Sequence, residues 1–238
     1  MDVNWILVLV GVLAGFLSGS FGFGGGMVLL PVITSVYGIE LAIPISTVAQ
    51  LLSNLSRAGM GFRQIQWKQV LLFLATAAPL TALGAIGFSL ADKTLMTRIL
   101  CVGLIIFAVM KISGKMHLPK KNATLLVGGG VTGFINGMLG ISGPLSSAVV
   151  FALDLGAVAY IASEAAAAAM MHVVKIVVYN KFALMDLSVF LNGLYIGCAM
   201  MLGNFVAMRL IGKMKNKIYQ KIVAVAMILL SIWLFIQA

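Results

Sequence analysis

Two glycine-rich interruptions inside apolar segments constrain this chain more than any other feature. The first runs from Gly15 to Gly26 and the second from Gly133 to Pro144, so they begin 118 residues apart (133 minus 15). An apolar environment requires every backbone N–H and C=O to be hydrogen-bonded, and irregular backbone is tolerated there only when it is buried in protein or lines a wet cavity. Breaks at matching positions of two halves are typical of a transporter's binding site.

The composition assigns the chain to the membrane class. It is 62% hydrophobic and 9% charged, against roughly 25% charged residues in a soluble domain. Its long apolar stretches are close to the ~20 residues that cross a bilayer as a helix; they include 67–91, 95–110, 187–208 and 222–236. We therefore expect an all-α polytopic membrane protein in which residues 1–238 form a single membrane domain.

The basic residues are read as topology determinants. The formal net charge is +10, but Lys and Arg lie mostly between the apolar segments, where they set orientation, so no nucleic-acid partner is expected. Cys101 and Cys198 lie far apart and form no CxxC or Cys/His spacing, so neither a disulfide framework nor a metal site is indicated. No cofactor is expected.

The second half of the chain repeats the first. Helix-contacting glycines recur at the offset of 118, and near the ends the register slips by five, so that residues 95–99 align with 218–222. This divides the chain into repeat one (1–112), a linker (113–122) and repeat two (123–238). The matching glycines form a small-xxx-small ridge that lets helices approach closely: Gly11, Gly15 and Gly19 match Gly129, Gly133 and Gly137.

The distribution of Lys and Arg decides how the glycine-rich blocks meet the membrane. If each block crosses, the flanking basic residues divide seven to seven; if each re-enters on the same side, they divide eleven to three, with Lys93, Arg98 and Lys181 in the minority. The positive-inside bias favours the second arrangement. Each repeat then has a re-entrant hairpin followed by three transmembrane helices, the two repeats are inverted, and both termini lie outside.

The second helix of each half carries a polar stripe. Spacings of four, four and three residues keep side chains on one face of a helix, and intramembrane ionisable residues are costly enough to be functional candidates. The stripe of half one is Ser46, Gln50, Asn54 and Arg57, and that of half two is Glu164, Ala168, His172 and Lys175. Two alternatives stay open: the cations snorkel to an interface, and the amides only bridge helices.

The positive charge of Arg57, Lys175 and the nearby helix starts predicts a site that binds an anion. Helices that restart after Gly26 and Pro144 present free N–H groups and a positive dipole end, and Arg57 and Lys175 lie at corresponding positions of the two halves. The candidate substrate-binding residues are Ser20, Gly22, Gly24, Gly25, Gly26, Ser46, Gln50, Asn54, Arg57, Gly140, Ser142, Gly143, His172 and Lys175.

Glu164 is the acid placed deepest in an apolar segment. A carboxyl group in a low dielectric favours its neutral form, which suits proton coupling, and His172, two turns away, could extend such a relay. The alternative is that Glu164 only neutralises Lys175 or His172.

An enzymatic reading competes with transport. Gly140-Ile141-Ser142-Gly143 resembles the GxSG nucleophile motif of rhomboid intramembrane proteases, with His172 as the base. The other half has Gly24 where Ser142 stands, and a dyad needs no duplicated anion site. We therefore expect a transporter and no enzyme; an anion channel with the same site is the alternative.

The glycine pattern from Gly15 to Gly26 followed by Pro31, its degenerate copy ending at Pro144, and the helices bearing Arg57 and Lys175 resemble the TauE/SafE sulfite exporter family. That resemblance implies a bacterial-type inner-membrane carrier of small anions, chiefly sulfite and organosulfonates. The expected partners are such an anion and the lipid bilayer, and a homo-oligomer is left open. Transport is then secondary-active, by alternating access around a midplane site.

Overall fold

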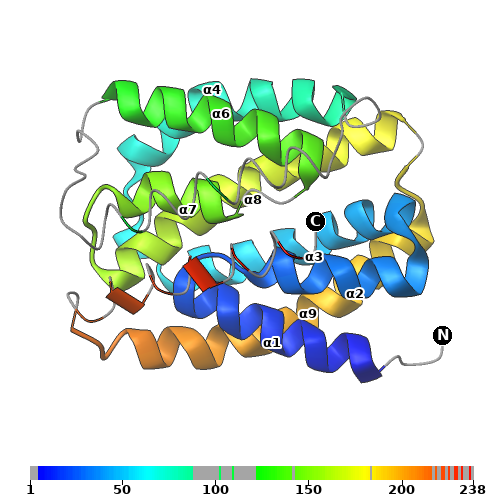
Figure 1. Ribbon diagram of the computed structural model, residues 1–238, viewed down its shortest axis with the longest axis horizontal. Coiled ribbons are helices and arrows are strands. Elements are labelled where there is room, and N and C mark those ends of the chain that lie inside the picture. Colours follow the sequence, from blue (N-terminus) through cyan, green and yellow to red (C-terminus); the bar gives the residue numbers. More distant parts are fainter. Residues whose placement is uncertain are drawn as a thin grey trace.

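The computed structural model describes residues 5–87, 122–140, 143–182 and 184–215, with single positions at 102 and 109 and after 215. The described residues are helical and contain no strand, which confirms the all-α prediction for this part of the chain (Figure 1). The elements are α1 (Trp5–Phe21), α2 (Gly25–Tyr37), α3 (Ile39–Met60), the 3-10 helix η1 (Phe62–Gln64), α4 (Trp67–Ile86), α6 (Asn122–Leu139), α7 (Gly143–Phe151), α8 (Ala157–Lys181) and α9 (Leu187–Ile211).

Three of the described helices are long and apolar enough to cross a membrane: α4, α8 and α9. Helices α1 and α2 are apolar but shorter, with 17 and 13 residues. The predicted spans at 95–110 and 222–236 lie outside the described residues, apart from single positions, as does nearly all of the predicted linker 113–122.

Both helix breaks occur where the glycine pattern predicts them. Helix α1 ends at Phe21 and α2 begins at Gly25, and Gly22 and Gly24 between them have φ angles of 84° and 96°. Gly140 follows α6 with a φ of 68°. Only glycine adopts this left-handed backbone at no steric cost, so each break is encoded locally.

The helices pack as a central pair between two outer pairs. Figure 1 shows α4 and α6 along one edge, α1 and α9 along the opposite edge, and α3 and α8 between them. The most apolar window of α8 is 61% buried, against 33% for α4, so α8 is the central helix of the described bundle. It crosses α3 in the opposite direction, because Arg57 pairs with Glu164 while the later Gly61 lies against the earlier Val158.

Glycines allow the outer pairs to touch backbone to backbone. A Cβ added at Gly15 of α1 would collide with the main-chain carbonyl of Met200 in α9, and one added at Gly133 of α6 would collide with that of Ala77 in α4. The glycine ridges of α1 and α6 therefore face α9 and α4, and they hold α1 and α6 closely against these helices.

Replacing Asp186 by alanine is expected to lower the free energy of unfolding by about 1 kcal/mol, the usual cost of losing an N-cap. Its Oδ1 accepts a hydrogen bond of 2.7 Å from the backbone N–H of Val189 in the first turn of α9. Thermal unfolding in detergent measures the loss. Asp186→Asn keeps an acceptor at the cap, so it should unfold close to the wild-type temperature; an equal loss in both variants would contradict the capping role.

Candidate functional site

A single pocket joins the two breaks to the middle of the central helix pair. The space that the centre of a water molecule can occupy in it is about 30 Å³, so the pocket is narrow in this conformation, with room for a water-sized solute. The first break and the start of α7 meet here, since Gly143 lies against Phe23. The lining residues are Ser18, Gly22, Phe23, Gly24, Gly25, Gly26, Met27, Gln50, Ser53, Asn54, Arg57, Asn136, Gly140, Gly143, Pro144, Ser146, Glu164, Ala168 and His172.

Two helices begin at the pocket. Helix α2 starts at Gly25 with no side-chain cap on Gly24, and its first backbone bond runs from Val28 N to Gly24 O. The N–H groups of Gly25, Gly26 and Met27 therefore have no partner within the helix, and all three residues line the pocket. Helix α7 likewise begins there, with Gly143 and Pro144. Free N–H groups and positive dipole ends favour a bound anion.

The first break is held by groups from distant parts of the chain. The Oγ of Ser147 donates to the carbonyl of Gly22 at 3.1 Å, and the hydroxyl of Tyr160 donates to that of Phe21 at 2.8 Å. Both donors belong to the second half of the chain. They satisfy carbonyls that the interrupted helix leaves open, as buried irregular backbone requires.

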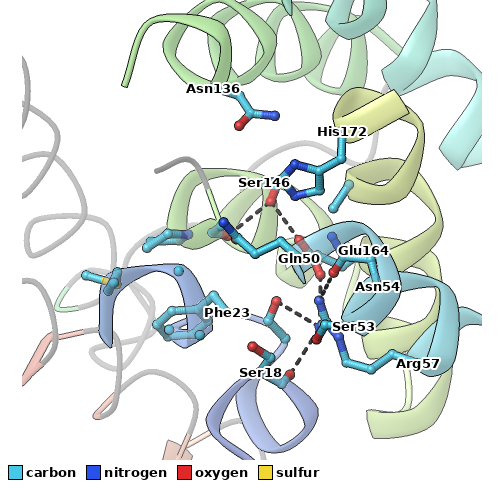
Figure 2. A pocket seen from close by; sticks show the side chains of 18 of the residues that line it. Ser18, Phe23, Gln50, Ser53, Asn54, Arg57, Asn136, Ser146, Glu164 and His172 are labelled. Carbon is cyan, nitrogen blue, oxygen red and sulfur yellow. Dashed lines mark hydrogen bonds and ion pairs between the residues drawn. The ribbon is translucent and has the colours of Figure 1, made fainter. Parts of the chain in front are cut away.

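Arg57 is the most heavily bonded side chain of the pocket. It is 3% exposed, and its Nη1 donates to the carbonyls of Ser18 and Gly22, both at 3.1 Å. The same nitrogen pairs with Glu164 Oε2 at 3.2 Å, and Nη2 donates to Asn54 Oδ1. In Figure 2, Arg57 and Glu164 point toward each other from α3 and α8, with Ser18 on the α1 side. The guanidinium thus links the backbone at the first break to Glu164 of α8.

Glu164 is shared between three helices. Its Oε2 pairs with Arg57 of α3, and its Oε1 accepts a hydrogen bond of 2.8 Å from Ser146 Oγ of α7. The hypothesis that it neutralises Lys175 or His172 is wrong for this conformation. His172 and Lys175 lie eight and eleven positions further along the same helix, about 12 and 16.5 Å away at 1.5 Å per residue, whereas Arg57 faces Glu164 across the helix pair.

Lys175 is buried without an acidic partner in the part of the chain that the structure describes. Its side chain is 0% exposed, and Nζ donates to Asn136 Oδ1 at 3.2 Å. Close by, His172 is buried, and its Nδ1 has no hydrogen-bond partner among the described residues. Neither Lys175 nor Arg57 reaches the surface, so the snorkelling alternative is wrong for both.

The pocket brings together most of the residues that the sequence singled out. Ser20, Ser46 and Lys175 are buried but do not line it; the Oγ of Ser46 accepts a hydrogen bond from Gln50 at 2.8 Å. Ser142 lies outside the described residues. The expected residues that do line the pocket are Gly22, Gly24, Gly25, Gly26, Gln50, Asn54, Arg57, Gly140, Gly143, Glu164 and His172.

Four polar residues that line the pocket are not among the predicted binding residues: Ser18, Ser53, Asn136 and Ser146. Asn136 could have been found, because it stands 118 positions after Ser18 and is an amide inside the second glycine-rich segment. Ser146 lies in the first turn of α7 and carried no signal, since its role depends on the approach of Glu164 from α8.

Comparison with known proteins assigns the chain to a family. The family model described as "Sulfite exporter TauE/SafE" matches residues 7–234. The chain belongs to the TauE/SafE family. A protein of Methanocaldococcus jannaschii, described as a probable membrane transporter protein, is 30% identical over 95 residues, which are 36% of this chain and 36% of that protein. The match thus spans only about a third of that relative. No solved structure matches the chain.

Membership of the TauE/SafE family, together with the long apolar helices, makes this a multi-pass membrane protein. Both the family and the relative's name point to membrane transport and away from an enzyme. Within the described residues no group of three or more His, Cys, Asp or Glu side chains could hold a metal ion.

Proposed function

We propose that this protein is a secondary-active carrier of small anions, with sulfite or an organosulfonate as the substrate. The observation that carries the proposal is the meeting of two helix starts, those of α2 and α7, with a buried guanidinium in one pocket. Sulfite and sulfonates present three oxygens around a charge, and backbone N–H groups and an arginine fork suit such acceptors. The pocket residues that we assign to binding are those predicted above together with Ser18, Asn136 and Ser146.

Packing supports two structural repeats, 1–112 and 123–238. Three glycines of α6 contact α4 just as the matching glycines of α1 contact α9. The glycines of α6 stand 118 positions after those of α1, and the contacted residues of α9 stand 123 positions after those of α4. Gly129, Gly133 and Gly137 lie against Phe73, Ala77 and Thr81, and Gly11, Gly15 and Gly19 lie against Ile196, Met200 and Asn204. The shift of five between the offsets is the shift found between residues 95–99 and 218–222.

The two cations make corresponding contacts. Arg57 donates to the carbonyl of Ser18 in α1, and Lys175 donates to the side chain of Asn136, which stands 118 positions later in α6, the helix before the second break. The corresponding helices α3 and α8 run in opposite directions, which favours an inverted relation of the repeats. Alternating access is then a rocking of one repeat against the other around the pocket.

Helix lengths favour re-entrant hairpins. With 17 and 13 residues, α1 and α2 are about 26 and 20 Å long at 1.5 Å per residue, short of the ~30 Å hydrocarbon core. Each repeat then crosses three times after its hairpin, in a bacterial-type inner membrane with both termini outside. Glu164 is the group that we assign to proton coupling, with His172 on the same helix as a relay.

Uptake into proteoliposomes tests the proposal. Sulfite, sulfoacetate, thiosulfate and lactate are compared, and we expect saturable uptake with counterflow for the sulfur oxyanions. Unitary currents in place of counterflow would instead favour an anion channel with the same site. Equal flux in protein-free liposomes for all four anions would refute anion transport.

Lys175→Ala is expected to slow uptake of the best substrate about ten- to a hundredfold, since interactions with a charged donor are worth about 1.5–3 kcal/mol. The buried ammonium is then absent from a site that must attract an anion. Lys181→Ala is the matched control, because Lys181 ends the same helix and is exposed. Equal rates for wild type, Lys175→Ala and Lys181→Ala would remove Lys175 from the site.

A further inference from the structure

The positive and negative charges of the side chains around the pocket are unequal in number. Three are buried there among the described residues: Arg57, Glu164 and Lys175. Arg57 and Glu164 form the ion pair of 3.2 Å, whereas the partner of Lys175 is the neutral amide of Asn136. With all three groups ionised, one positive charge is left without a counter-charge. An uncompensated buried charge is strongly disfavoured, so the empty site favours the entry of one negative charge.

Asn136 connects this excess charge to the pocket. An ammonium group can only donate hydrogen bonds, so its contact with Lys175 fixes the amide oxygen of Asn136 toward Nζ. The amide nitrogen remains as a donor, and Asn136 lines the pocket. Figure 2 shows Asn136 and His172 on the side of the pocket opposite Ser18. An anion in the pocket would therefore lie between the amide nitrogen of Asn136, whose oxygen contacts Lys175, and the start of α2 at Gly25.

Glu164 pairs with Arg57, so the guanidinium is not free to bind a second negative charge of a substrate. Its Oε2 holds Arg57 Nη1, and Ser146 holds its other oxygen. A proton added to Oε2 neutralises the carboxylate and frees Arg57 while Ser146 stays in place. The other titratable groups that face this region are Tyr160, whose hydroxyl bonds to the carbonyl of Phe21, and His172. Among the described pocket residues, Glu164 is the one acid.

We propose that the pocket selects its substrate by charge, so that a monoanion binds while Glu164 is ionised and a dianion binds only after Glu164 has taken up a proton. This rests on the proposed anion transport at the same pocket. The charges balance in both cases: Arg57, Lys175 and ionised Glu164 leave one positive charge for a monoanion, and protonated Glu164 leaves two for a dianion. The carrier then moves one proton with each dianion and none with a monoanion.

Methanesulfonate and sulfate provide the test. They are tetrahedral ions of similar size that differ by one charge, and both are fully ionised near neutral pH, so neither carries a proton itself. Proteoliposomes holding a pH-sensitive dye are given each anion in turn, with the membrane potential clamped. For the wild type we expect sulfate uptake to acidify the lumen by one proton per sulfate, and methanesulfonate uptake to leave the lumen pH unchanged.

Glu164→Gln makes the carboxyl permanently neutral. The ratio of sulfate to methanesulfonate uptake is expected to rise at least about tenfold, because the site now has two uncompensated cations, and sulfate uptake should no longer acidify the lumen. Asp186→Asn is the matched control: it makes the same chemical change in an acid that caps α9 and should keep wild-type selectivity and proton movement.

Several results would overturn this inference while leaving anion transport intact. They are wild-type sulfate uptake without acidification, proton movement with methanesulfonate, sulfate uptake by neither the wild type nor Glu164→Gln, and sulfate-driven acidification that persists in Glu164→Gln. The wild-type measurements decide the matter even if Glu164→Gln does not fold. Lack of flux for these ions and for sulfite and sulfoacetate alike would instead overturn the proposed function itself.

Discussion

Arg57→Ala is expected to reduce anion uptake by at least about a hundredfold, since breaking a buried ion pair costs about 3–5 kcal/mol. The variant loses the guanidinium, and it also leaves Glu164 as an unpaired carboxylate that repels the substrate. The carbonyls of Ser18 and Gly22 lose their shared donor, so the first break is loosened as well. Initial rates of sulfite or sulfoacetate uptake in proteoliposomes measure the effect.

A second variant separates loss of transport from loss of folding. Arg57→Ala combined with Glu164→Ala removes both charges of the pair, so it is expected to unfold at a higher temperature than Arg57→Ala alone and still to transport poorly. Arg63→Ala is the control for a change of charge, because Arg63 is exposed in η1. Near-normal uptake by Arg57→Ala would show that this guanidinium does not contribute to the anion site.

Gly133→Val is expected to destabilise the fold by roughly 3 kcal/mol or more, as overpacking of a tight contact does. Its side chain would meet the main-chain carbonyl of Ala77, and because backbone cannot move aside as a flexible side chain can, α6 and α4 must separate. The second hairpin would then lose its support, and with it the start of α7 at the pocket. Thermal unfolding in detergent and the yield of folded protein measure the loss.

The first half offers a paired test of the same argument. Gly15→Val meets the carbonyl of Met200 in α9, so it should lower the unfolding temperature by an amount similar to Gly133→Val if the two repeats are equivalent. Gly59→Ala is the control, because a Cβ there has no atom of the described chain within 4 Å and alanine favours a helix. A stable Gly133→Val would contradict the close packing of α6 on α4.

The Arg57–Glu164 pair links the fold to the proposed mechanism. It connects α3 to α8, which correspond to each other in the proposed repeat, and it lies beside both helix starts. A substrate that competes with Glu164 for Arg57 would therefore weaken the contact between the central helices. In this arrangement, binding of the anion and rearrangement of the two halves depend on the same bond.

The sequence alone was sufficient for the local features. A left-handed backbone favours glycine wherever it occurs, so Gly22, Gly24 and Gly140 marked the breaks without reference to the rest of the chain. The helical period placed Gln50, Asn54 and Arg57 on one face, and all three line the pocket. The glycine pattern was also sufficient to recognise the TauE/SafE family, which the family model confirms.

Only the tertiary structure decided which buried groups pair with one another. Glu164 and Lys175 share one stripe of α8, but they are too far apart along the helix to pair, and the approach of α3 supplies Arg57 to Glu164 instead. The same packing supplies Asn136 to Lys175 and Ser146 to Glu164. Helix periodicity specifies which residues share a face, but the partner of a buried charge is set by the distance between neighbouring helices, which depends on how the whole bundle packs.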